Sequence, residues 1–250
     1  MTLELRMNAF RAIVLIAIMV GLSIVPVLSH NFVTGIFNSP QIQENLKNSP
    51  LGREGFSAIF SNYNFYSYAE WYGGNYNLLS IIAAIIISFP IFAREKERKT
   101  IYLISGRRTR WEIFSSKVLS GYILTAITVV TGGLFYYIFS RIMGFYLDSN
   151  MVMIWTLRVT AGSLLFFQIG AYTSMIFSGQ VRPILLDIAI YAGLLTAGAF
   201  KQTKFLDFPQ YMTGQDVLVN QSLGITFAIL LTITAIIFVL QYFHFKNSEL

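Results

Sequence analysis

The residues best suited to chemistry lie in one segment, Phe92 to Lys117, which reads FAREKERKTIYLISGRRTRWEIFSSK. It contains eight of the 18 Lys and Arg residues of the chain and three of its 12 acids: Arg94, Lys96, Arg98, Lys99, Arg107, Arg108, Arg110, Lys117, Glu95, Glu97 and Glu112. Charges of both signs suit a contact with a soluble protein, because complementary charges fix the register of an interface. The segment therefore predicts a docking surface rather than a catalytic centre.

The rest of the sequence offers little for catalysis. It has no cysteine, which excludes disulfides, thiolate metal sites and thiol nucleophiles. Its two histidines, His30 and His244, lie near opposite ends of the chain, each where an apolar segment ends. Neither a G-x-x-x-x-G-K-[ST] nor a G-x-S-x-G pattern occurs. We therefore do not expect this chain to be an enzyme, or to bind a cofactor or metal by itself.

The composition places the chain in a membrane. It is 55% hydrophobic and 12% charged, whereas soluble domains carry about 25% charged residues. Such a chain cannot cover a globular surface with polar groups, so lipid must be the solvent for most of it. Basic residues at a membrane face explain the net charge of +6 without a nucleic-acid partner.

Six apolar segments are long enough to cross a bilayer, for which a helix needs about 20 residues. They are continuous rather than alternating, which favours helices over barrel strands. Residues 1–250 are thus predicted to form one all-α transmembrane domain with these spans: Ala12–Val33, Tyr76–Ala93, Val118–Ser140, Thr156–Ser178, Pro183–Phe200 and Leu223–Phe243. Pro26 and Pro90 are expected to kink the first two.

The distribution of Lys and Arg predicts the orientation. With the N-terminus in the cytoplasm, 12 of these residues lie inside and 6 outside. The excess is concentrated in the short segment between the second and third spans, where the positive-inside rule is most reliable. We therefore expect a multi-pass protein of the plasma (cytoplasmic) membrane with both termini cytoplasmic.

The charged segment is predicted to be a structured elbow. Good helix formers continue the second span through Lys99, and Ser105-Gly106 then stops the helix. Thr109 and Glu112 have the spacing of a capping box for the next helix. The alternative is a positive-inside loop that only sets topology.

Two outside loops carry many aromatic residues. Thr34–Asn75 ends in a dense aromatic stretch, which suits anchoring in the headgroup region. A surface that reads substrate is the alternative. Lys201–Ser222 surrounds Pro209 with apolar residues and could form short interfacial or re-entrant helices.

The elbow resembles the motif of the ABC-2 type permeases, the membrane subunits of ATP-binding-cassette exporters. Twelve positions match that motif in residue type and spacing. They are Glu95, Glu97, Thr100, Ile101, Leu103, Ile104, Ser105, Thr109, Arg110, Glu112, Ile113 and Lys117. Lys99 stands where that family has glycine, and Arg107 where it has proline. The motif covers this segment only, while six spans match the family's topology.

The resemblance implies a coupling helix that contacts a separate P-loop ATPase subunit, in which ATP and Mg would bind. The coupling residues it implies are Glu95, Glu97, Arg98, Thr100, Ser105, Gly106, Arg107, Arg108, Thr109, Arg110 and Glu112. It also implies a second permease chain, identical or not, surrounded by membrane lipid. The cargo expected from apolar walls is a hydrophobic or amphipathic peptide, antibiotic or lipid-like molecule.

Three polar residues within the spans need a role. Asp187 is expected to be an interfacial carboxylate paired with Arg182 or the elbow, or else a substrate contact. Gln168 is expected to join helices, or to line a pathway. Arg158, near the outer end of its span, is expected to extend its guanidinium to the interface.

Two other functions stay open on the sequence. One is a membrane scaffold or regulator that uses the elbow only to recruit a cytoplasmic protein. The other is an ion-coupled carrier centred on Asp187, although such carriers favour buried acids at the midplane and broken helices in two halves of the chain.

Overall fold

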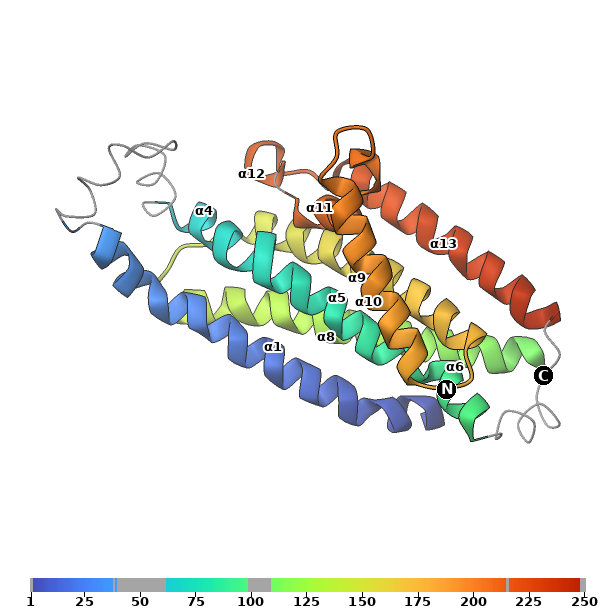
Figure 1. Ribbon diagram of the computed structural model, residues 1–250. Helices are drawn as coiled ribbons and strands as arrows, with labels where there is room; N and C mark the ends of the chain where they lie inside the picture. The colour runs from blue at the N-terminus through green and yellow to red at the C-terminus, as the bar shows by residue number, and fades with distance from the viewer. Residues whose placement is uncertain (1, 38, 40–61, 99–108, 215, 248–250) are drawn as a thin grey trace.

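A computed structural model describes residues 2–37, 39, 62–98, 109–214 and 216–247 of the chain. Within these ranges the fold is helical without strands, and six helices are long and apolar enough to cross a membrane (Figure 1). The long elements are α1 (Thr2–Phe37), α5 (Tyr76–Ser88) with α6 (Pro90–Glu97), α8 (Arg110–Ile142), α9 (Ser149–Ile176), α10 (Val181–Gly198) and α13 (Gly224–Asn247). The predicted all-α class is confirmed for the described residues, and each predicted span corresponds to one of these six long apolar helices.

The long helices form a bundle with α9 in its interior (Figure 1). Helix α9 packs against α5, α8, α10 and α13, whereas α1 packs mainly on α8. Outward faces of α1, α10 and α13 carry exposed apolar side chains, which suits contact with lipid. We call the end where α1 begins and α13 ends the terminal end, and the opposite end the loop end (Figure 1).

The second span begins earlier than the sequence indicated. Helix α4 (Tyr63–Ser67) and the π-helix η1 (Tyr68–Asn75) lead without a gap into α5. The aromatic stretch expected at the headgroups therefore belongs to the bundle core: Tyr66, Trp71 and Tyr72 are buried. Tyr72 donates a hydrogen bond to the Gly133 carbonyl of α8 at 2.8 Å. The prediction of an extended aromatic outside loop is thus wrong for Tyr63–Asn75, while residues 40–61 lie outside the described part.

Pro90 breaks the second span, as expected, between α5 and α6. A break leaves the first N–H groups of the new helix without intrahelical acceptors. Ser174 of α9 supplies the missing partner: its Oγ accepts from the N–H groups of Phe92 and Ala93 at 3.1 and 3.0 Å. It also donates to the Phe89 carbonyl at 2.6 Å. One buried serine thereby fixes the break against the central helix.

Glycines allow close contacts between the helices. A Cβ atom on Gly133 would lie 2.5 Å from the Thr156 hydroxyl of α9. A Cβ on Gly170 of α9 would lie 2.1 Å from the Ser88 hydroxyl of α5. Both distances are shorter than real Cβ contacts, so a larger side chain at either position would displace the facing hydroxyl or the helix that carries it.

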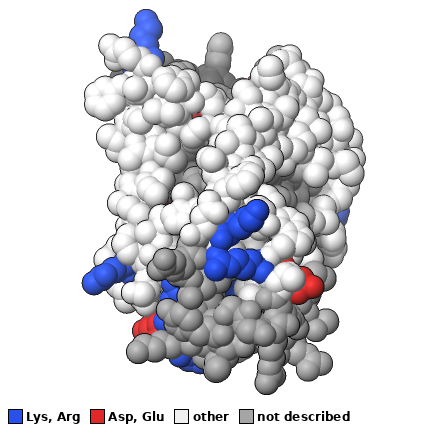
Figure 2. Space-filling view, turned by 90° about the vertical axis from the view of Figure 1, so that its right-hand side faces the viewer, with Lys and Arg blue, Asp and Glu red and all other residues white. Residues whose placement is uncertain are grey.

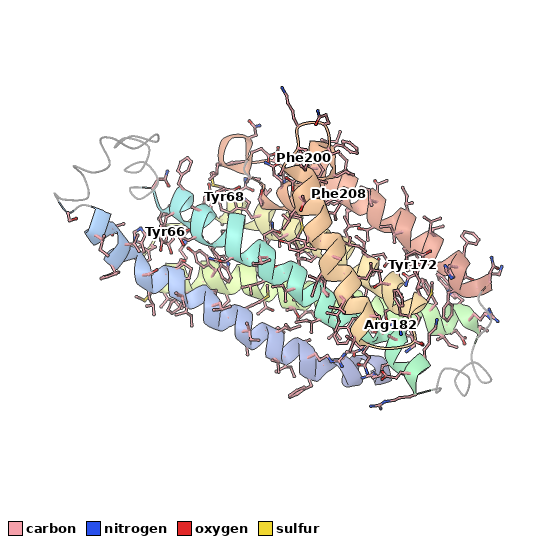
Figure 3. All side chains as sticks on the ribbon, in the orientation of Figure 1. Tyr66, Tyr68, Tyr172, Arg182, Phe200 and Phe208 are labelled. Atoms are coloured by element: carbon pink, nitrogen blue, oxygen red, sulfur yellow. The ribbon has the colours of Figure 1, made fainter. Side chains whose placement is uncertain are left out.

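Short helices cover the loop end between α10 and α13. They are η2 (Lys204–Leu206), α11 (Phe208–Thr213) and α12 (Val217–Asn220). Figure 3 shows α10 running from Arg182 at the terminal end toward Phe200 at the loop end. The short helices predicted for this region therefore form.

Arg158 is held inside the protein by groups of the loop end, a set of partners that the sequence did not indicate. Its side chain is 1% exposed and makes a two-pronged ion pair with Asp216 at 2.6 and 2.8 Å. It also donates to the carbonyls of Ser222 and Leu223 at 3.0 and 2.8 Å. The guanidinium turns inward because its five donors fit this cluster of acceptors. Arg158 thus fastens the segment before α13 to α9.

Candidate functional site

The candidate site lies at the terminal end, within the charged segment of the sequence. It consists of the two helix ends that border residues 99–108: the end of α6 with Arg98, and the start of α8 with Thr109. We call these two borders the frame. Helix α6 enters it and α8 leaves it. Residues 99–108, which include Thr100, Ser105, Gly106, Arg107 and Arg108, lie outside the described part of the chain. The turn predicted at Ser105-Gly106 and the coupling helix itself therefore stay predictions, and the site is built here from its two borders.

The last turn of α6 is held by groups from α9 and the link to α10. Lys96 donates a hydrogen bond to the Met175 carbonyl. Gln180 donates to a carboxylate oxygen of Glu97 at 2.9 Å. Lys and Arg side chains near a helix C-terminus also interact well with the helix dipole. Helix α6 thus continues the second span to Glu97, close to the limit predicted from the sequence.

A buried ion pair joins the two borders of the site. The Lys117 ammonium of α8 lies 2.5 Å from Glu95 Oε1 of α6, with side chains 2% and 7% exposed. Both residues matched motif positions, and their pairing places the two helices side by side. Removing charges from water is costly, so such a pair persists only where its partners are well placed. Glu95 therefore positions the frame rather than meeting a partner protein directly.

The start of α8 confirms the predicted capping box. Thr109 Oγ1 accepts from the Glu112 N–H at 3.2 Å, and Glu112 accepts from the Thr109 N–H at 3.0 Å. This reciprocal pair satisfies two of the donors that a helix start leaves open. The chain's own residues therefore define the start of the helix at Arg110.

Helix α8 is also fastened to the end of α13. Arg110 donates to the Lys246 carbonyl at 2.5 Å. The ring of Trp111 meets Tyr242 edge to face at 4.8 Å between centroids, and Phe114 is fully buried among Phe92, Phe238 and Phe245. Helix α6 is thus held by α9, and helix α8 by α13.

The surface around the frame is basic. Figure 2 looks onto the terminal end and shows blue Lys and Arg side chains around the grey, undescribed residues, with fewer red ones. Of the predicted coupling residues, Glu97, Arg98, Thr109, Arg110 and Glu112 are exposed and Glu95 is buried. Glu97, Arg98 and Arg110 therefore place charged side chains at the surface, whereas the carboxylate of Glu112 is engaged in its cap.

Gln168 lies in the bundle core. Its Oε1 accepts from the Tyr122 hydroxyl of α8 at 2.5 Å, and its Nε2 donates to Gln241 of α13. Its side chain is fully buried. The residue thus joins three helices, which is the first of the two roles considered from the sequence.

Asp187 is also buried, but not in the pairing expected. Its Oδ1 accepts from the Thr173 hydroxyl of α9 at 2.8 Å. Its Oδ2 has no hydrogen-bond partner among the described residues, and no ion pair with Arg182 forms there. Arg182 is exposed instead. The carboxylate faces the interior near Ser88 and Gly170, because Gly170 leaves room for it.

Several residues of the site were not found from the sequence. Ser174, Met175 and Gln180 all contact α6, yet they lie about eighty positions further along the chain, and nothing in their local sequence indicates this role. The acidic and basic motif positions did contain a signal for the Glu95–Lys117 pair, since the spacing put both at the borders of one elbow.

Comparisons of the chain with known protein families, curated proteins and solved structures give no significant match. A function for this chain is therefore argued from its own geometry and from the motif in its charged segment.

Proposed function

We propose that this chain is the permease subunit of an ATP-driven exporter of the ABC-2 type. A separate P-loop ATPase would dock on the frame around residues 98–109, on a cytoplasmic face, and a second permease chain would complete the path. The cargo would be hydrophobic or amphipathic, such as a peptide, an antibiotic or a lipid-like molecule. The chain itself would hydrolyse nothing.

The observation that carries the proposal is the set of contacts that join the two borders of the frame to each other and to the long helices. The Glu95–Lys117 pair joins its borders, Ser174 ties α6 to α9, and Arg110 ties α8 to α13. A displacement applied between residues 98 and 109 would therefore move three long helices as rigid bodies instead of bending a loop. Rigid-body movement of packed helices is a common way to transmit conformational change.

Charge reversal at exposed positions of the frame tests the proposal. Glu97→Lys with Arg98→Glu should abolish cargo-stimulated ATP hydrolysis by the purified complex, because complementary charges set the register of such a contact. Arg110 is less suitable because it also holds the Lys246 carbonyl. Lys201→Glu, exposed at the loop end, is the matched control and should leave hydrolysis unchanged. Unchanged ATPase turnover in the double variant would reject the coupling role.

An ion-coupled carrier is the second candidate, and Asp187 is the observation that favours it. Its Oδ2 is buried without a hydrogen-bond partner among the described residues, and acids inside spans often mark ion pathways. Asp187→Asn should leave ATP-driven transport largely intact. Loss of proton-dependent flux on this change, in vesicles without an ATPase, would favour the carrier. A scaffold would bind its cytoplasmic partner with or without Asp187→Asn, would lose that partner on charge reversal at Glu97 and Arg98, and would move no cargo.

A further inference from the structure

A cleft of about 430 Å³ opens at the loop end, far from the charged frame. The helices η1, α5, α10 and α11 line it, with Gly74, Asn77, Tyr191, Leu195, Asp207 and Thr213 among the lining residues. Sites for small molecules commonly measure about 300–1,000 Å³. One wall is a π-helix, a rare element that occurs frequently at functional sites. The volume and the wall together make this cleft a candidate ligand site.

Asn77 gives the cleft an unused acceptor. Its side chain is 6% exposed, and its Nδ2 donates to the Pro209 carbonyl at 3.1 Å. This bond fixes the orientation of the amide, yet Oδ1 has no hydrogen-bond partner among the described residues. A buried carbonyl oxygen without a donor is costly. A ligand that brings a donor would satisfy it.

Asp207 gives the cleft a negative charge. Its Oδ1 accepts from the Gln210 N–H at 3.0 Å and thereby caps α11. Thr213 donates its hydroxyl proton to the Gln210 carbonyl at 2.7 Å, so its oxygen can only accept from a ligand. None of the described residues lining the cleft is Lys or Arg. The polar side of the cleft thus favours a cationic donor over an anion.

The opposite side of the cleft is apolar and aromatic. Leu195 and the ring of Tyr191 come from α10, whose outward face is exposed. An aromatic face attracts a cation, and aliphatic side chains accept a hydrocarbon tail. The cleft therefore has hydrogen-bond acceptors on one side and an apolar surface on the other.

We propose that this cleft binds the ammonium group of an amphipathic molecule. The ammonium would lie between Asp207 and Asn77 Oδ1, with its apolar part along Tyr191 and Leu195. Such a group can come from a lipid headgroup or from a dissolved cationic amphiphile. The inference does not depend on an ATPase partner, so it can fail or succeed independently of the exporter proposal.

Site-specific labelling tests the proposal, because the chain has no cysteine of its own. Gly74→Cys places one thiol in the cleft; a Cβ there meets its nearest neighbour at an ordinary 3.5 Å. The rate of reaction with a membrane-impermeant maleimide is measured in phosphatidylglycerol vesicles with added hexylammonium. At ten times its dissociation constant, the amine should slow labelling about tenfold. Hexanoate and hexanol should not.

Two Asp→Asn substitutions distinguish the loss of the cleft's charge from the loss of a helix cap. Asp207→Asn keeps a capping side chain but removes the charge, and should weaken protection about tenfold or more. Asp148→Asn is the matched control: Asp148 caps α9 in the same way, through the Asn150 N–H at 2.9 Å, but does not line the cleft. It should leave protection unchanged. A thiol at Tyr146→Cys, exposed outside the cleft, should react at the same rate with and without the amine.

The lipid composition then identifies the source of the ammonium. If a lipid headgroup occupies the cleft, labelling of the Gly74→Cys variant will be slow in phosphatidylethanolamine vesicles even without hexylammonium. If labelling there equals that in phosphatidylglycerol, a dissolved amphiphile is the ligand. Equal protection by hexanol and hexylammonium, or protection that survives Asp207→Asn, would overturn the proposal.

Discussion

At the scale of single residues, one buried ion pair fixes the geometry of the charged frame. Glu95 and Lys117 lie 22 positions apart and both side chains are almost fully buried. Their attraction compensates the loss of hydration only while both are present. The pair matters for stability because removing either residue takes away the opposite charge that lies 2.5 Å from the other.

Replacing Lys117 should therefore be severe. Lys117→Ala should destabilise the chain by about 3–5 kcal/mol, since it leaves the Glu95 carboxylate buried. Unfolding of the purified chain in detergent micelles measures this loss. The double variant Glu95→Gln/Lys117→Gln should lose less than the two single changes together, because partners in contact do not act independently. Strictly additive losses would contradict a direct pairing.

At the scale of elements, the bundle depends on polar fastenings between helices. Arg158 fastens the segment before α13, Gln168 joins α8, α9 and α13, and Ser174 fixes the break at Pro90. Each fastening satisfies polar groups that lipid would leave unpaired. Helix α13 therefore stays on the bundle although little of its surface is buried.

The Arg158–Asp216 fastening should make stability depend on pH. The hydrogen bonds from Arg158 hold the pKa of Asp216 below its ordinary value, more than partial burial raises it. The folded state then binds fewer protons than the unfolded state, so this contribution is complete above the unfolded pKa of about 3.9. It is lost as pH falls through the lowered pKa of the folded state.

Asp216→Asn should lower the melting temperature in detergent near neutral pH, where the wild-type carboxylate is charged. The gap between wild type and variant should shrink as the pH is lowered through the acidic range, because protonated Asp216 no longer pairs with Arg158. A gap of constant size at every pH would show that the charge of Asp216 does not contribute.

The sequence predicted the elements better than their contacts. Apolar runs indicated all six spans, and Thr109 with Glu112 indicated the start of α8, because both signals are local. The aromatic stretch was assigned to the interface because rings suit both the headgroups and a core, and only the packing against α8 and α9 decides between them. The ion pair of Arg158 was not predicted because its partner, Asp216, lies 58 positions away.

At the scale of the whole molecule, the two ends differ in charge and in role. The terminal end collects basic side chains around the charged frame (Figure 2), whereas the loop end has an acidic, partly apolar cleft. Central helix α9 contacts elements at both ends. A partner acting on the frame would therefore reach the loop end through one continuous helix.

The most direct test of the central claim is cross-linking from the frame in native membranes. A photoreactive probe is attached to a single thiol at Arg98→Cys, and in a matched variant to Tyr146→Cys at the loop end, since the chain has no other cysteine. The products are identified by mass spectrometry. We predict that the Arg98 position captures a P-loop ATPase and the Tyr146 position does not. Absence of any nucleotide-hydrolysing protein at Arg98, or equal capture at both ends, would contradict the account.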